Sequence, residues 1–85
     1  MTKLFVSFHA ITLISFMSDV MKREVGLIIR EARKRKSLTQ KELAERIGVT
    51  KTIITNYEAG RQNLTIDTLQ KVADALGAEL KISIV

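Results

Sequence analysis

The segment TQKELAERIGVTKTIITNYEAG, residues 39–60, constrains the fold most, because it places two short helices almost end to end. Each helix opens on a threonine, Thr39 or Thr50, whose hydroxyl can accept a hydrogen bond from the backbone at a helix start. Glu42 follows Thr39 at the spacing of a capping box. Gly48 suits the left-handed residue that ends the first helix. We therefore expect two capped helices joined by a sharp turn.

The apolar residues of this segment fall at the spacing of two helices that pack against each other. They are Leu43, Ala44, Ile47, Val49, Ile54 and Tyr57. By contrast, the outward positions at the start of the second helix are polar, except for Ile53, which the same spacing predicts to face outward. A buried helix would carry apolar residues at these positions, so we expect them to meet a partner.

Two further helices are predicted on either side. Ser18 or Asp19 can cap a helix that ends in the basic series 33–36. Thr65 can cap another that stops at Gly77. The apolar face predicted for that last helix consists of Ile66, Leu69, Val72, Ala73 and Leu76.

The last eight residues, AELKISIV, alternate apolar and polar side chains and predict a strand. A single strand is not stable alone. Its partner is either the apolar run KLFVSFHAITLISFM, residues 3–17, or the same strand of a second subunit. The sequence thus divides into an apolar N-terminal extension (1–17), a helical domain (18–77) and a C-terminal strand expected to dimerise (78–85).

The N-terminal run itself permits a strand or a helix. It lacks a basic leader beyond Lys3 and a small-residue cleavage site before Asp19, and it is short for a membrane span. We therefore expect an ordered packing or dimerisation element and no membrane attachment. The alternative is upstream sequence translated from an early start, with Met17 or Met21 as the natural beginning.

Positive charge is concentrated on the central helices. The net charge is +5, but residues 22–61 hold eleven basic and five acidic residues, which leaves +6 there, whereas residues 62–85 hold two basic and three acidic ones. Such a concentration is typical of a nucleic-acid binder, although a solvated helix face would look the same. The absence of cysteine excludes disulfides and thiolate metal sites and suits a cytoplasmic protein.

No pattern of catalytic or cofactor-binding residues is present. The sequence has no His-Glu-x-x-His motif, no glycine-rich phosphate loop, and a single histidine, His9, inside the apolar run. Four-residue spacings suggest that carboxylates serve in surface ion pairs, Glu31 with Arg35 and Glu42 with Arg46. We expect no enzyme activity, no cofactor and no metal.

The polar residues that open the second of the two central helices suit DNA. Thr50 can donate to a phosphate while it caps the helix, and Lys51 can reach a phosphate or the acceptors of guanine. Thr52 offers a hydroxyl and a methyl group to base edges, and Asn56 can form paired hydrogen bonds with adenine. Each residue also has a plainer role, as a cap or a solubilising group, but those roles leave the shared spacing unexplained.

Two more residues flank this set. Gln40, at the start of the preceding helix, is placed to reach the DNA backbone. Thr55 is expected beside the base-reading residues, facing the DNA backbone.

Residues 26–77 resemble the Xre-type, or phage-repressor (Cro/CI), helix-turn-helix family, through IREARKRKSLTQKELAERIGVTKTIITNYEAG and the following NLTIDTLQKVADALG. The resemblance implies a mainly α, four- to five-helix lambda repressor-like domain, here with a C-terminal β-strand. It also implies a structural salt bridge between Arg33 and Glu58. It places DNA-base contacts on Gln40, Lys51, Thr52 and Asn56, and phosphate contacts on Arg61 and Gln62.

Two departures from the family pattern matter. Leu64 replaces a common proline, and the strand replaces the usual fifth helix, which puts dimerisation through such a helix in doubt. The family implies a homodimeric, sequence-specific repressor that binds double-stranded DNA at an inverted repeat. The short chain with a terminal strand is similar to antitoxin members, which regulate their own operon and bind a toxin. The alternative function is a module whose basic face binds an acidic protein, such as a toxin, without specific DNA binding.

Overall fold

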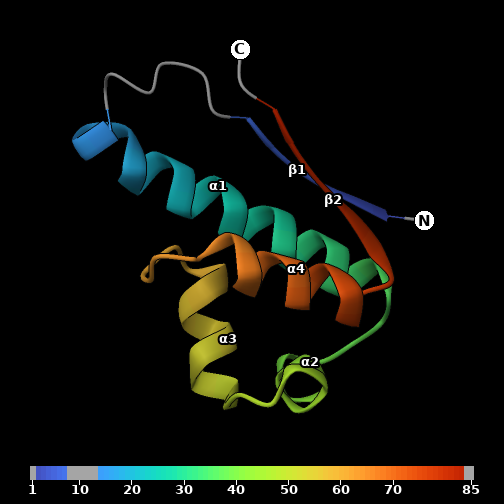
Figure 1. Ribbon diagram of the computed structural model, residues 1–85. Coiled ribbons are helices and arrows are strands. Elements are labelled where there is room, and N and C mark those ends of the chain that lie inside the picture. Colours follow the sequence, from blue (N-terminus) through green and yellow to red (C-terminus); the bar gives the residue numbers. More distant parts are fainter. Residues whose placement is uncertain (1, 8–13, 84–85) are drawn as a thin grey trace.

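A computed structural model describes the backbone of residues 2–7 and 14–83 and the side chains of residues 19–81, so His9 lies outside the described part. The fold is mainly α with a C-terminal strand, as the sequence predicted. The elements, shown in Figure 1, are β1 (Thr2–Ser7), α1 (Ile14–Arg35), α2 (Gln40–Ile47), α3 (Lys51–Glu58), α4 (Ile66–Ala75) and β2 (Ala78–Ser83).

The start of α1 differs from the prediction. The helix begins at Ile14, so neither Ser18 nor Asp19 caps it. Serine and aspartate are only weakly disfavoured inside helices, and no glycine or proline interrupts the residues before them, so the helix extends backwards through both. Asp19 instead lies 3.7 Å from Lys22 Nζ, one turn along the helix.

The core lies between α1 and the other three helices. Its largest fully buried side chains come from all four helices and from the residue that caps the end of α4: Ile29, Leu43, Ile54, Val72 and Leu76. Burial of each such side chain stabilises the fold by about 1.5–3 kcal/mol. The predicted apolar face of α4 is wrong at one end, because Ile66, in the first turn, is exposed.

A glycine brings α1 against the end of α3. A Cβ atom built on Gly26 would lie 2.5 Å from the Tyr57 carbonyl oxygen and 2.6 Å from that of Glu58. Both neighbours are backbone atoms, which no rotamer change can move away. The two helices therefore approach as closely as they do because residue 26 has no side chain.

The two strands form a parallel pair in which Thr2 is the Cα partner of Ala78 and Ser7 that of Ser83. Of the two partners considered for the C-terminal strand, the structure shows the N-terminal run of the same chain. β1 contacts α1 and β2 contacts α4, whereas α3 contacts α1 and α2. The sheet and α3 thus lie on opposite sides of the layer formed by α1 and α4 (Figure 1).

Candidate nucleic-acid interface

Threonine caps fix where α2 and α3 begin. Thr39 Oγ1 accepts from the Glu42 N–H at 3.0 Å, and the Thr39 N–H donates to the Glu42 carboxylate at 3.0 Å, which completes the predicted capping box. Thr50 Oγ1 accepts from the Ile53 N–H at 3.3 Å. Between the helices Gly48 has φ +74°, a left-handed conformation that glycine adopts without strain. The turn between α2 and α3 is therefore dictated by local sequence.

The polar residues at the start of α3 are accessible. Thr50, Lys51 and Thr52 are exposed, and Asn56 is half-buried one turn further along. Ile53, for which the sequence predicts an outward position, is also half-buried.

Arg61 and Gln62 are exposed in the loop after α3. The Arg61 N–H donates to the Asn56 carbonyl at 2.9 Å, so this loop starts from a fixed position at the end of the helix.

Arg33 and Glu58 form a bidentate ion pair between α1 and α3. Arg33 Nε donates to Glu58 Oε2 at 2.6 Å and Nη2 donates to Oε1 at 3.0 Å, while Nη1 donates to the Leu38 carbonyl at 2.8 Å. Arg33 is 9% and Glu58 8% exposed. The hydrogen bond to Glu58 raises the pKa of the Arg33 guanidinium, against the lowering effect of burial. Two guanidinium nitrogens thereby hold α3 against α1, and the third holds the loop between α1 and α2.

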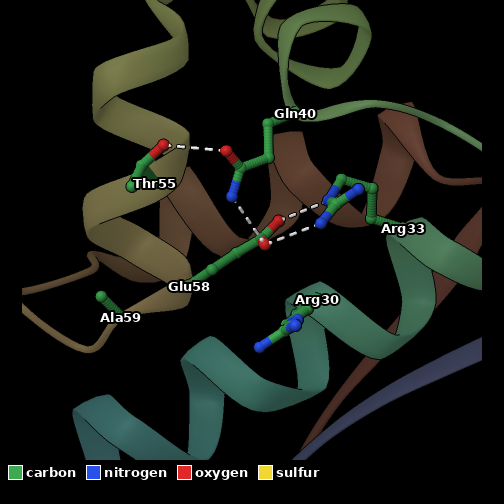
Figure 2. A pocket seen from close by; sticks show the side chains of 6 residues that line it. All are labelled: Arg30, Arg33, Gln40, Thr55, Glu58 and Ala59. Atoms are coloured by element: carbon green, nitrogen blue, oxygen red, sulfur yellow. Dashed lines mark hydrogen bonds and ion pairs between the residues drawn. The ribbon is translucent and has the colours of Figure 1, made fainter.

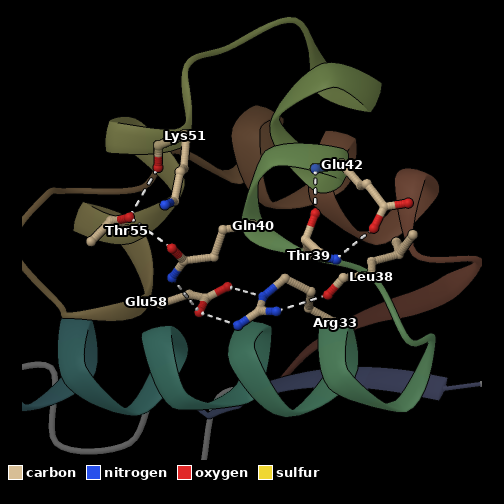
Figure 3. A network of polar contacts seen from close by, with 8 residues as sticks. All are labelled: Arg33, Leu38, Thr39, Gln40, Glu42, Lys51, Thr55 and Glu58. Atoms are coloured by element: carbon tan, nitrogen blue, oxygen red, sulfur yellow. Dashed lines mark hydrogen bonds and ion pairs between the residues drawn. The ribbon is translucent and has the colours of Figure 1, made fainter.

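Gln40 and Thr55 extend this ion pair into a network across α2 and α3, shown in Figure 3. Gln40 Nε2 donates to Glu58 Oε1 at 3.1 Å, and the Thr55 hydroxyl lies 2.9 Å from Gln40 Oε1 and 3.1 Å from the Lys51 carbonyl. Since a carboxylate only accepts hydrogen bonds, the nitrogen of the Gln40 amide must face Glu58. Two residues predicted as DNA contacts therefore also join α2 to α3.

An open pocket of about 300 Å³ lies between α1, α2 and α3 and is lined by Arg30, Arg33, Gln40, Thr55, Glu58 and Ala59 (Figure 2). Arg33 is neutralised by Glu58, whereas exposed Arg30 has no ion-pair partner among the described residues. Sequence reasoning missed Arg30 because its exposure and its place beside Gln40 depend on how α1 packs on α3.

The predicted surface pairs are not formed in the part of the chain with described side chains. Neither Glu31 with Arg35 nor Glu42 with Arg46 lies within 4.0 Å. The Glu42 carboxylate is engaged in the capping box, and Arg46 Nη1 donates to the Ala75 carbonyl at 3.0 Å. Arg46 therefore links α2 to the end of α4.

None of the helices in the described residues is both long and apolar enough to cross a membrane. Those residues also hold no group of three or more His, Cys, Asp or Glu side chains placed to bind a metal ion.

Comparison with known proteins identifies relatives of this structure. The family model described as Helix-turn-helix (HTH_3) matches residues 29–82, more than half of the chain. An uncharacterized HTH-type transcriptional regulator of Methanothermobacter thermautotrophicus is 48% identical over 52 residues, which cover 61% of this chain and 75% of that protein. Multiprotein-bridging factor 1 of Candida albicans is 44% identical over 57 residues, which cover 67% of this chain and 38% of that relative. The chain thus spans well under half the length of this second relative.

Two solved structures share the architecture. The restriction-modification controller protein C.AhdI from Aeromonas hydrophila superposes with a TM-score of 0.71 at 28% identity, covering 75% of this chain and 91% of that one. The clp gene regulator ClgR from C. glutamicum gives 0.67 at 33% identity, covering 68% and 74%. The chain therefore belongs to the Xre/Cro/CI-type helix-turn-helix family, which has the lambda repressor-like fold and consists of DNA-binding regulators rather than enzymes.

Proposed function

We propose that this chain is a sequence-specific transcriptional repressor that reads double-stranded DNA through α3. The observation that carries the proposal is a pair of exposed polar residues, Lys51 and Thr52, at the start of a helix that the Arg33–Glu58 ion pair fixes to α1. A rigidly mounted helix with polar residues at its first turn suits insertion into the major groove.

The base-reading residues differ in what they can recognise. Lys51 can donate to O6 and N7 of guanine, and Asn56 can form a paired hydrogen bond with adenine. Thr52 can meet a base edge with its hydroxyl or a thymine with its methyl group. Thr50, Arg61 and Gln62 contribute phosphate contacts, which set the position on the duplex and carry no sequence information.

Arg30 adds a phosphate contact to this surface. It lines the pocket with Gln40 and Thr55 and has no ion-pair partner among the side chains that the structure describes. A cation on α1 next to the start of α2 attracts the DNA backbone regardless of sequence. Gln40 and Thr55 contribute mainly by positioning α3, because each is hydrogen-bonded within the protein.

The operator we propose is an inverted repeat bound by a homodimer. Two α3 helices would occupy successive major grooves about 34 Å apart. Support for regulation comes from the relatives above that are named as gene regulators or controllers.

Two other functions, antitoxin and protein-bridging module, make predictions that differ from those of a repressor. An antitoxin would need a second surface for a toxin, and none of the relatives named above is described as an antitoxin. A protein-bridging function, through the basic face, has support in the name of the 44% identical relative. Such a module would bind an acidic protein and show no preferred DNA sequence.

Selection from a random duplex library tests the proposal. The wild-type chain should enrich one inverted repeat, and binding to it should survive excess competitor DNA at two salt concentrations, because specific contacts add to the electrostatic attraction. Failure to enrich any sequence would contradict sequence-specific regulation and favour the bridging function.

A matched pair of variants tests whether Arg30 contacts a phosphate. Arg30→Ala should weaken binding to all sequences alike and reduce the slope of log affinity against log salt by about one. Lys71→Ala, an exposed lysine on α4, is the control and should change neither. If Arg30→Ala behaves like Lys71→Ala, Arg30 does not contact a phosphate.

A further inference from the structure

We propose that Arg23, in the first half of α1, is a further contact to the phosphates of the DNA backbone, beside the loop that follows α3. This inference deepens the proposed function and rests on it only in needing a chain that binds DNA, with or without a preferred sequence. Arg23 lies outside residues 29–82, the part of the chain that the family model matches. A contact there is an addition to the helix-turn-helix unit rather than a part of it.

Arg23 packs directly against Gly60, where the loop after α3 begins. A Cβ atom built on Gly60 would lie 2.8 Å from both the Cα and the Cγ atoms of Arg23 and 2.9 Å from its backbone nitrogen. The loop passes so close to α1 only because residue 60 has no side chain. The stem of Arg23 is therefore held against the loop backbone, and the next residue of the loop is the exposed Arg61. Two cations from different elements thus flank Gly60.

The positive charge of Arg23 is not neutralised by the side chains that the structure describes. Arg23 is exposed and forms no ion pair with any of them. Asp19, the acid one turn earlier on α1, lies 3.7 Å from Lys22 Nζ instead. The loop facing Arg23, residues 59–66, contains no acidic residue. An exposed cation without a partner, close to a second cation, attracts a polyanion such as the DNA backbone.

Arg23 and Arg30 lie on one face of α1 and flank the end of α3. They are seven residues apart, which is roughly two turns and about 10 Å along the helix axis. Arg30 lines the pocket with Ala59, whereas Arg23 meets Gly60. Phosphates follow one another along a DNA strand at about 3.4 Å of axial rise, so the two arginines are spaced to reach different phosphates. Arg23 therefore adds a contact to that of Arg30.

The salt dependence of binding to a duplex of any sequence tests this contact in the full chain. Arg23→Gln removes the charge and keeps a good helix former. It should reduce the slope of log affinity against log salt by about 0.9, so its loss of affinity should be roughly threefold larger at about 50 mM salt than at about 200 mM. Arg23→Lys keeps the charge and should restore the wild-type slope.

Lys71→Gln is the matched control, because it removes one charge from an exposed position on α4. It should leave the slope unchanged. Thermal unfolding should show that all the variants are folded, since both side chains are exposed. An Arg23→Gln slope equal to that of Lys71→Gln, or an Arg23→Lys protein as impaired as Arg23→Gln, would overturn the inference.

Neutral phosphates locate the contact on an operator selected from the library. A methylphosphonate, which removes the charge of one phosphate, should weaken wild-type binding at each contacted position in turn. Arg23→Gln should be insensitive to it at one of these positions in each half-site and keep the wild-type penalty at the others. A wild-type penalty at every position in Arg23→Gln would contradict the contact.

These outcomes separate the inference from the proposed function. If no DNA sequence is enriched but Arg23→Gln still lowers the slope and Arg23→Lys restores it, the proposed function fails and the contact stands. If the wild type binds a selected operator and Arg23→Gln behaves as Lys71→Gln does, the contact fails and the proposed function stands. A wild type without affinity for any duplex overturns both.

Discussion

Arg33 and Glu58 lie 25 positions apart and join α1 to the last residue of α3 through two hydrogen bonds, at 2.6 and 3.0 Å. Glu58 is an acid beside a basic surface, but Arg33 neutralises its charge inside the protein, so the carboxylate should not repel DNA. It also fixes the angle of α3, which is the element that we propose to read the operator.

Arg33→Ala should lower the free energy of unfolding by about 3–5 kcal/mol, because it leaves the Glu58 carboxylate buried without a cation. Urea denaturation at neutral pH measures the loss. Arg33→Met/Glu58→Met, which removes both charges, should recover much of the stability. A melting temperature unchanged in Arg33→Ala would show that the ion pair does not hold the helices together.

Gly26→Ala should destabilise the fold by about 1–3 kcal/mol, because the new methyl group meets the Tyr57 and Glu58 carbonyl oxygens. Helix propensity alone predicts the opposite sign, a gain of about 1 kcal/mol. Thermal unfolding decides between the two, with Glu24→Ala on the exposed face of α1 as the control. A stabilised Gly26→Ala protein would mean that α1 and α3 are less closely packed than these contacts require.

Thr55→Val should cost about 1 kcal/mol of stability, because valine keeps the shape of threonine but leaves the Gln40 amide oxygen without its donor. Thr55→Ser restores the hydroxyl and should lie within about 0.5 kcal/mol of the wild type. Denaturant unfolding of the three proteins makes the comparison. Equal stability of the valine and wild-type proteins would argue against the Gln40–Thr55 link.

The capping box should make stability depend on pH. The backbone N–H of Thr39 lowers the pKa of the Glu42 carboxyl. Since the folded-state pKa is lowered, the stabilisation is present above the ordinary glutamate value of about 4.3 and is lost as the pH falls through the lower folded value. Glu42→Gln should therefore be less stable than the wild type at pH 7, and the difference should shrink by pH 3. A gap of constant size across this range would contradict the assignment.

Local chemistry made the starts of three helices predictable from sequence. Thr39, Thr50 and Thr65 each accept a hydrogen bond from the backbone N–H three residues on, so a short pattern was sufficient to place α2, α3 and α4. The start of α1 was mispredicted because two residues with capping side chains, Ser18 and Asp19, lie inside the helix.

Long-range contacts were harder to predict. The Gln40–Thr55 link and the close approach at Gly26 depend on how helices cross, which no local pattern encodes. The N-terminal run permitted either a strand or a helix, and the structure uses both, with β1 formed from residues 2–7 and α1 starting at Ile14. Pairing of β1 with β2 joins the two ends of the chain and could be named only as one of two options.

The most direct test of DNA reading by α3 measures the dissociation constants of the wild-type and Asn56→Ala proteins for a set of operators. The set is built on the selected operator and contains each of the four base pairs at every half-site position. Asn56→Ala should lose about 1–3 kcal/mol of binding free energy and should lose discrimination at one symmetric position only. Lys51→Ala should do the same at a different position. If both variants bind the operator as the wild type does, with every preference intact, α3 is not the element that reads the sequence.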